Sequence, residues 1–388
     1  MPLLSDAQRL NWLRLARTPR IGPVRFQELI NLFGSAEEAL SRLPSFTARK
    51  GQPLHPPAVA QIEAEMEAAQ RLGAHFVARG EAGYPIALAT TDRPPPLLCT
   101  RGAAQAVANR PMVAIVGSRN ASAGALAHTK QVAADLGAAG IIVVSGLARG
   151  IDAAAHLGAL SSGTIAFFGG GLGEVYPPEH QSLADSIADS GGALYSEMPL
   201  NWSPRAQDFP RRNRLVAGAS LALLVVEAAI RSGSLITTRQ ANDLGRIVMA
   251  TPGFPLDPRS VGPNQLLRDG ANLVRNAQDI LEDLGPMLDQ QDAGETFASL
   301  PAQNTDTSND TNGFSEDFTG GENSQRWEEL DGTMASALSI SPTTFDLIVE
   351  AAGVAPGPAR AWLLEHELAG EVVRYPGDRF ACAPPQGS

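Results

Sequence analysis

Four short, fully apolar runs alternate with helix-length segments between residues 112 and 281, and this alternation constrains the fold more than any other feature. The runs cover residues 112–116, 141–144, 164–168 and 221–226. Residues 122–139 and 151–160 have the length of helices. Strands that are apolar on both faces and alternate with helices predict a parallel sheet covered on both sides. We therefore predict an α/β fold with a doubly wound, mostly parallel sheet.

Small and basic residues follow these runs, at the place where parallel strands end. Gly117-Ser118-Arg119 follows the first run, and Ser145-Gly146 follows the second, with Arg149 shortly after it. Ligands of doubly wound sheets bind beyond the carboxyl ends of the strands. Glycine lets the backbone approach an anion, a helix N-terminus attracts it, and arginine supplies two parallel donors. We predict a phosphate site at this edge; the alternative is a set of tight turns with solvated arginines.

The spacing of these residues does not fit two common phosphate-binding motifs. The turn at Gly117 lacks the second and third glycines of G-x-G-x-x-G, and the second run ends without the acidic residue that would hold a ribose. The chain also has no G-x-x-x-x-G-K-[ST] sequence. Asp152 and His156 are explained as a helix cap and a packed histidine, and with Ser145 they do not resemble a nucleophile site. We expect no cofactor, no metal and no catalytic residue.

Arginines are concentrated in residues 197–246, where seven arginines stand against four acidic residues. Phe209-Pro210-Arg211-Arg212-Asn213-Arg214 places three arginines at the start of a predicted helix, directly after an aromatic ring, and Arg205 precedes them. Cations for phosphates and a ring for a base are what single-stranded nucleic acid requires. The alternative is a solvated basic helix face. Ser232-Gly233-Ser234 follows the fourth apolar run, and with Ser234 as the N-cap it predicts a second anion-binding turn.

The charge of the chain is unevenly distributed. The formal net charge is −11, but residues 282–331 hold thirteen acidic residues and one arginine, so the remainder sums to about +1. An acidic segment does not prevent a separate domain from having a basic face. The two cysteines, Cys99 and Cys382, give neither a disulfide framework nor a zinc pattern. No apolar run has the length of a signal peptide or a membrane span, so we expect a cytoplasmic protein that contacts no membrane.

The regions on either side of the sheet have their own patterns. Residues 1–75 show helical spacing, and Gly22-Pro23 lies in a turn like that of a helix-hairpin-helix or SAM-like domain, which can contact a DNA backbone or serve as a plain bundle turn. Residues 76–284 form the predicted core, and 285–325 are polar and acidic and predict a disordered linker. Residues 326–388 predict a winged helix, whose second helix carries Glu365 and Glu367 and so favours a protein contact or a structural role over DNA reading.

Taken together and in this order, the motifs resemble those of the DNA-processing protein A (DprA, or Smf) family. They include VAIVGSR, VSGLARGIDAAAH, FPRRNRLVAGAS, RSGSLITTRQA and DPRSVGPNQLLRDGA, and they cover roughly residues 80–280. The resemblance implies an extended Rossmann-like core that binds single-stranded DNA without sequence preference, a homodimer, no catalysis, and loading of the RecA recombinase during natural transformation. It also implies the residues of the DNA site: Gly117, Ser118, Arg119, Ser145, Gly146, Arg149, Arg205, Phe209, Arg211, Arg212, Arg214, Ser232, Gly233 and Ser234. Gly173-Glu174 departs from the family pattern, which often has Asp before the Tyr-Pro pair.

A second function class shares the glycine-rich loops of this sheet. Phosphoribohydrolases that act on nucleoside monophosphates have a related Rossmann-like core, and their signature is P-G-G-x-G-T-x-x-E. The glycine run 169–173 lacks the proline and the threonine of that signature, and Glu174 follows at the wrong spacing. The nucleotide-processing enzyme therefore stays the alternative to the DNA-binding mediator.

Overall fold

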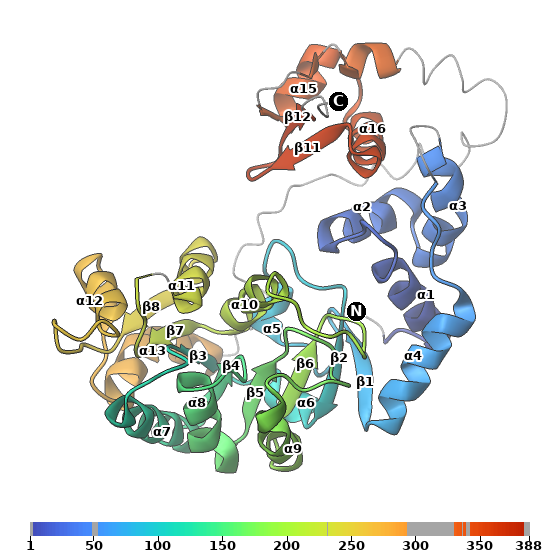
Figure 1. The fold of residues 1–388 in the computed structure, drawn as a ribbon. Coiled ribbons are helices and arrows are strands. Elements are labelled where there is room, and N and C mark those ends of the chain that lie inside the picture. Colours follow the sequence, from blue (N-terminus) through green and yellow to red (C-terminus); the bar gives the residue numbers. More distant parts are fainter. Residues whose placement is uncertain are drawn as a thin grey trace. The chain divides into compact units, whose positions relative to one another are not determined.

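The computed structural model describes residues 3–48, 53–230, 232–292, 330–335, 337–338 and 342–383. The chain divides into two compact units (Figure 1). The first unit combines residues 1–10 with 59–302, and the second combines residues 11–58 with 303–388. The second unit therefore brings together helices from the start of the chain and a small domain from its end.

A nine-stranded sheet forms the centre of the first unit, in the order β1-β2-β6-β5-β4-β3-β7-β8-β9. All neighbours from β6 to β9 pair in parallel, whereas β1 and β2 pair antiparallel at one edge. The strands are β1 (Ala74–Ala78), β2 (Leu97–Gly102), β3 (Met112–Val116), β4 (Ile142–Ser145), β5 (Thr164–Phe167), β6 (Ala193–Ser196), β7 (Ala222–Val225), β8 (Ile247–Ala250) and β9 (Asn272–Leu273).

Helices cover both faces of this sheet because successive strand residues point to opposite faces and both sets are apolar. Ala114 and Val144 pack on one side with α5 (Ile86–Ala89), α6 (Ala104–Val107), α10 (Asp208–Ala219) and α11 (Gly233–Asp243). Val113 and Val143 pack on the other side with α7 (Ala123–Ala138), α8 (Ile151–Ala159) and α13 (Ala277–Asp292). The remaining elements of the unit are α4 (Val59–Arg71), α9 (Gln181–Asp189), α12 (Val261–Arg268) and two short 3-10 helices, Leu160–Ser162 and Pro178–His180.

The chain changes direction across the sheet between β3 and β7. The connections from β3 through β4 and β5 to β6 run one way along the sheet, and the chain then returns to place β7 on the other side of β3. Such a switch point leaves a crevice beyond the carboxyl ends of the two strands, which is where ligands bind in open α/β sheets. The loops that follow β3 and β7 therefore border the expected ligand position.

The second unit joins three helices to a winged helix. The helices α1 (Asp6–Ala16), α2 (Pro23–Phe33) and α3 (Ala36–Ala48) pack around Leu15, Phe26 and Leu43; the first residues of α1 belong to the first unit. The winged helix consists of β10 (Thr343–Thr344), α15 (Phe345–Ala352), α16 (Pro356–Ala369), β11 (Val372–Tyr375) and β12 (Arg379–Cys382), and its sheet has the order β10-β12-β11.

The predicted fold class is confirmed: a mostly parallel doubly wound sheet, a helical N-terminal region and a C-terminal winged helix. One boundary is wrong. Helix α13 continues through Asp292, so the first eight residues of the predicted linker are helical, and the rest of the linker lies outside the described residues. Within the described ranges, no helix combines the length and apolar character needed to cross a membrane.

Candidate functional site

Two side chains join the loops at the switch point. The buried carboxylate of Glu227, just after β7, accepts hydrogen bonds from the backbone N–H (2.9 Å) and the hydroxyl (2.7 Å) of Ser122, the N-cap of α7. The hydroxyl of Ser234 in α11 donates to the carbonyl oxygen of Gly117 at 2.8 Å. These contacts bring the N-termini of α7 and α11 to the same edge of the sheet. Two helix N-termini at one edge favour an anion there.

The N-cap of α11 differs from the prediction. Ser232, not Ser234, is the N-cap, and its hydroxyl accepts the N–H of Ser234 at 3.2 Å. The reason is that Ser234 uses its hydroxyl on the loop after β3, a partner 117 residues away that local spacing could not reveal. Gly233 is exposed beside them.

A buried carboxylate binds the backbone of the loop after β4. Asp152 Oδ2 accepts the backbone N–H groups of Gly146 (3.2 Å) and Ala148 (3.3 Å). The hydroxyl of Ser145 is fully buried and donates to the carbonyl oxygen of Ile115 at 2.6 Å. Ser145 therefore stabilises the sheet with its side chain and does not present it to a ligand.

Arg212 is also a structural residue. Its guanidinium is buried and donates to the carbonyl oxygens of Phe167 (2.6 Å) and Gly146, so it connects the ends of β5 and β4. Gly146 is required here, since a Cβ at this position would lie 2.4 Å from Arg212 Nη1. Burial lowers the pKa of Arg212 to about 10, partly offset by the charge of Asp152, and leaves the guanidinium charged at neutral pH. The prediction that Arg212 contacts a phosphate does not fit this burial.

Three further arginines of the predicted site have acidic partners. Arg211 Nε donates to the buried Glu197 carboxylate at 2.6 Å, and Arg214 forms an ion pair with the other oxygen of that carboxylate. Arg149 forms an exposed ion pair with Glu179. An exposed pair such as that of Arg149 is weak and leaves the arginine able to exchange its partner for a phosphate.

Two other arginines of the predicted site lie against aromatic rings. Arg119 lies over Phe209, with 5.5 Å from its Cζ to the ring centroid, and Arg205 lies over Trp202 at 4.7 Å. Neither guanidinium forms a hydrogen bond or an ion pair with any residue that the structure describes. Tyr176 extends this aromatic surface, 5.6 Å from the ring centroid of Phe209. Cations beside partly exposed rings can hold phosphates while bases stack.

Sequence reasoning missed four residues that build this surface: Trp202, Asp208, Tyr176 and Glu227. Trp202 donates its ring N–H to Asp208 at 2.9 Å, which fixes the ring under Arg205. Tyr176 adds a ring beside Phe209. Glu227 connects the loop after β7 to the start of α7. The isolated Trp202 just before the arginine-rich stretch was the one local signal, whereas the partners of Glu227 are 105 residues away.

His156 is the buried side chain that could be taken for a catalytic base. His156 is fully buried, with Nδ1 2.9 Å from the hydroxyl of Thr164. Burial, with the nearby charge of Arg212, lowers the pKa of His156 to about 3, so the ring is neutral at physiological pH. A ring sealed inside the sheet layer cannot reach a substrate. The described ranges hold no cluster of three side chains suited to a metal ion.

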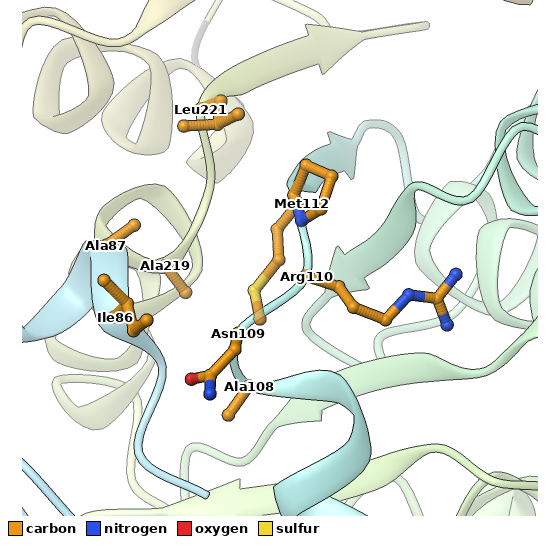
Figure 2. Close-up of a pocket in the computed structure, with 9 residues that line it drawn as sticks. Ile86, Ala87, Ala108, Asn109, Arg110, Met112, Ala219 and Leu221 are labelled. Carbon is orange, nitrogen blue, oxygen red and sulfur yellow. The ribbon is translucent and has the colours of Figure 1, made fainter. Parts of the chain in front are cut away.

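A shallow hollow lies at the other edge of the sheet (Figure 2). Its lining includes Met112, the first residue of β3, and Leu221, which directly precedes β7. Arg110 beside it is committed to the carbonyl oxygen of Gly140 at 2.8 Å. The hollow thus lies at the amino ends of β3 and β7, whereas the candidate site lies at their carboxyl ends. We therefore assign the hollow no part in ligand binding.

Comparisons with known proteins place each region in one family. The model of DNA recombination-mediator protein A matches residues 75–285, that of the DprA-like N-terminal HHH domain matches residues 6–68, and that of the DprA winged helix domain matches residues 323–378. Protein Smf of Synechocystis sp. is 31% identical, with 97% of this chain and 99% of that protein covered. Protein Smf of Escherichia coli is 35% identical, covering 78% and 76%. The X-ray structure of DNA processing protein A from Streptococcus pneumoniae is 31% identical, with a TM-score of 0.60, covering 70% of this chain and 97% of that one.

Proposed function

This chain belongs to the DNA recombination-mediator protein A family, and from that premise we propose that its sheet edge binds single-stranded DNA without sequence preference. The family model and both Smf relatives cover the sheet and its loops. The observation that carries the proposal is the pairing of the uncommitted Arg119 and Arg205 guanidiniums with the rings of Phe209 and Trp202. Such a surface contacts phosphates and base faces, which every sequence offers.

The proposed mechanism assigns separate tasks to separate groups. The N-termini of α7 and α11, together with Arg119, hold phosphates at the switch point. Phe209 offers its ring to a base, and Arg205 extends the cationic path beside Trp202. Arg149 exchanges its exposed ion pair with Glu179 for a phosphate when a strand binds, and the half-exposed Arg211 contacts a phosphate while Arg214 stays paired with Glu197. None of these steps needs bond making or breaking, so the protein acts as a binder and not as an enzyme.

The wider role follows from the family and is proposed with it. A protein that holds single strands by backbone and base faces can protect incoming DNA and pass it to the RecA recombinase, as in natural transformation. A homodimer would bring two such sheet edges to one strand. Size-exclusion chromatography with light scattering tests the dimer, and RecA filament assembly on a strand already coated with this protein tests the transfer.

The deciding experiment is a titration of labelled oligo-dT, a mixed-sequence strand and a matched duplex, followed by fluorescence anisotropy at two salt concentrations. We expect similar affinities for the two single strands, weaker binding of the duplex, and a steep loss of affinity with salt. Equal affinity for strand and duplex would point to a general polyanion surface. An absence of binding at low salt and micromolar protein would overturn the proposal.

A further inference from the structure

Helix α16 of the winged helix is buried on more than one side. Ala359, Trp362 and Leu363 pack into the core of the winged helix, against residues such as Phe380. Leu364 and Leu368, on another side of α16, belong instead to the core formed by α1, α2 and α3. A helix that reads DNA in a winged helix needs one open face. In this structure that face is covered by the N-terminal helices of the same unit.

The C-terminal end of α16 covers Arg20 in the hairpin turn between α1 and α2 and Arg25 in the first turn of α2. Arg20, which has a left-handed backbone with a φ of 68°, donates from Nη1 to the carbonyl oxygen of Leu368 at 2.6 Å. Arg25 Nη2 lies 3.2 Å from the carbonyl oxygen of Glu367 and 3.0 Å from its carboxylate Oε1. The last carbonyl oxygens of a helix carry the negative end of its dipole. The two arginines therefore meet two carbonyl oxygens and a carboxylate, as they would meet the oxygens of a phosphate.

The junction between α16 and the N-terminal helices contains buried polar atoms, some of which have no hydrogen-bond partner among the described residues. Arg374 in β11 forms an ion pair with Glu28 in α2, which strengthens the junction. Within the described residues, however, Glu367 Oε2, Glu28 Oε2 and Arg374 Nη1 are buried without a hydrogen-bond partner. A buried polar atom without a partner costs free energy. The junction is thus held by apolar packing and by the ion pairs of Arg25 and Arg374, and it is opposed by the unsatisfied charged atoms, a balance that a competing anion can shift.

We propose that the hairpin turn is a second binding site, for the phosphate backbone of duplex DNA, and that the C-terminal end of α16 occupies it as an anionic substitute. Arg20 and Arg25 bind the phosphates once α16 has left. The winged helix therefore acts as an internal cover of the hairpin turn and not as a DNA reader. The site does not depend on the sheet edge, because it lies in the other unit of the chain.

The test uses the full-length chain with Arg119→Ala in the background, so that the result does not depend on the sheet-edge site. Adding Glu367→Ala removes the carboxylate that competes for Arg25. We expect duplex affinity to rise and the slope of log K against log salt to steepen by about 0.9 for each arginine that gains a phosphate. Amide hydrogen exchange of residues 18–25 should become faster in the absence of DNA, because the cover is weakened.

Two further variants complete the design. Arg20→Ala with Arg25→Ala, added to Glu367→Ala, should remove the gain in duplex affinity. The charge exchange Arg25→Glu with Glu367→Arg keeps an ion pair and should restore slow exchange without raising duplex affinity. If exchange becomes faster in Glu367→Ala while duplex binding stays the same, the turn is not a phosphate site. If exchange does not change either, the end of α16 is not the cover, and both results overturn the proposal.

Discussion

At the scale of single residues, the arginines of the sheet edge have three different roles. Arg212 is buried between strand ends, and Arg211 and Arg214 share one carboxylate of Glu197. Arg119 and Arg205 lie over aromatic rings, and their guanidiniums form no hydrogen bond or ion pair with the part of the chain that the structure describes. Side chains of one type, close together in sequence, are thus expected to respond very differently to substitution.

Arg119→Ala should weaken the binding of single strands of every sequence. We expect the slope of log K against log salt to decrease by about 0.7, the value for one phosphate contact on a single strand. Arg71→Ala is the matched control, because Arg71 is exposed on α4 and has only a long surface pair with Glu67, at 3.7 Å. Anisotropy titrations at four salt concentrations measure the slope. If the binding isotherms of Arg119→Ala and Arg71→Ala are the same, Arg119 does not contact the strand.

Phe209→Leu should reduce affinity without changing the salt slope. The substitution keeps an apolar side chain beside Gly169 but removes the ring on which a base can stack. Stacking contributes roughly 1–3 kcal/mol per base, so we expect a loss of about fivefold to a hundredfold. The same titrations measure it, and a steeper or shallower slope would show that the ring acts through the arginines around it and not through a base.

Arg212→Ala should destabilise the fold. It leaves the carbonyl oxygens of Gly146 and Phe167 without their donor and Asp152 without its neighbouring cation. Removing one partner of a buried charged network costs about 3–5 kcal/mol. Arg211→Ala, which removes a half-exposed side chain, should cost no more than about 1 kcal/mol. Urea unfolding followed by circular dichroism compares the two, and equal losses would contradict this division of roles.

At the scale of elements, the site depends on contacts between segments far apart in the chain. Glu227 after β7 fixes the start of α7, and Ser234 in α11 fixes the loop after β3. His156 on α8 contacts Thr164 on β5, and Thr164 donates in turn to the carbonyl oxygen of Val143 on β4. Contacts between distant elements therefore set the positions of the loops at the sheet edge.

The burial of His156 should make stability depend on pH. The pKa of His156 is about 3 in the fold and near 6.5 in the unfolded chain, so below pH 6.5 only the unfolded chain binds the proton. Stability from this residue is complete above pH 6.5 and falls by about 1.4 kcal/mol per pH unit as the pH drops toward 3. Burial raises the pKa of Asp152, which acts in the opposite direction, so the comparison of the protein with its His156→Asn variant is the diagnostic measurement. Parallel pH profiles of the two unfolding free energies would contradict the assignment.

At the scale of the whole molecule, the acidic stretch 282–331 carries more negative charge than the net charge of the entire chain. We expect such a polyanionic segment, tethered to the proposed DNA-binding sheet edge, to compete with DNA through its high local concentration. This competition is electrostatic, so salt screens it.

Replacing the eight acidic residues within 293–329 by their amides should therefore tighten the binding of oligo-dT at low salt. We expect the difference from the unmodified chain to shrink as salt rises, because both interactions are screened. The control for net charge alone is the same number of amide substitutions at exposed carboxylates elsewhere in the described residues: Asp6, Glu37, Glu63, Glu67, Asp135, Asp189, Asp269 and Asp346. An equal gain from the control would show that total charge, and not the tethered segment, sets the affinity.

Much of the fold could be predicted because the signals are local. The run 112–116 is strand β3 to the residue, and predicted helix 151–160 agrees with α8 to within one residue. Both faces of these strands are apolar, and only a parallel sheet covered on two sides buries both. The edge at which Gly117, Gly146 and Arg119 gather follows from the parallel direction of the strands.

By itself the sequence determined the sheet, the edge that holds the basic and small residues, and the winged helix at the other end of the chain. Only the tertiary structure decided which arginines are free, because their partners come from other strands: Glu197 for Arg211, and the carbonyl of Phe167 for Arg212. It also decided that Leu364 and Leu368 of α16 pack with helices more than 300 residues earlier. The physical reason is range: hydrophobic periodicity is set by neighbours along the chain, whereas a charge is committed or free according to what the fold places within hydrogen-bond distance.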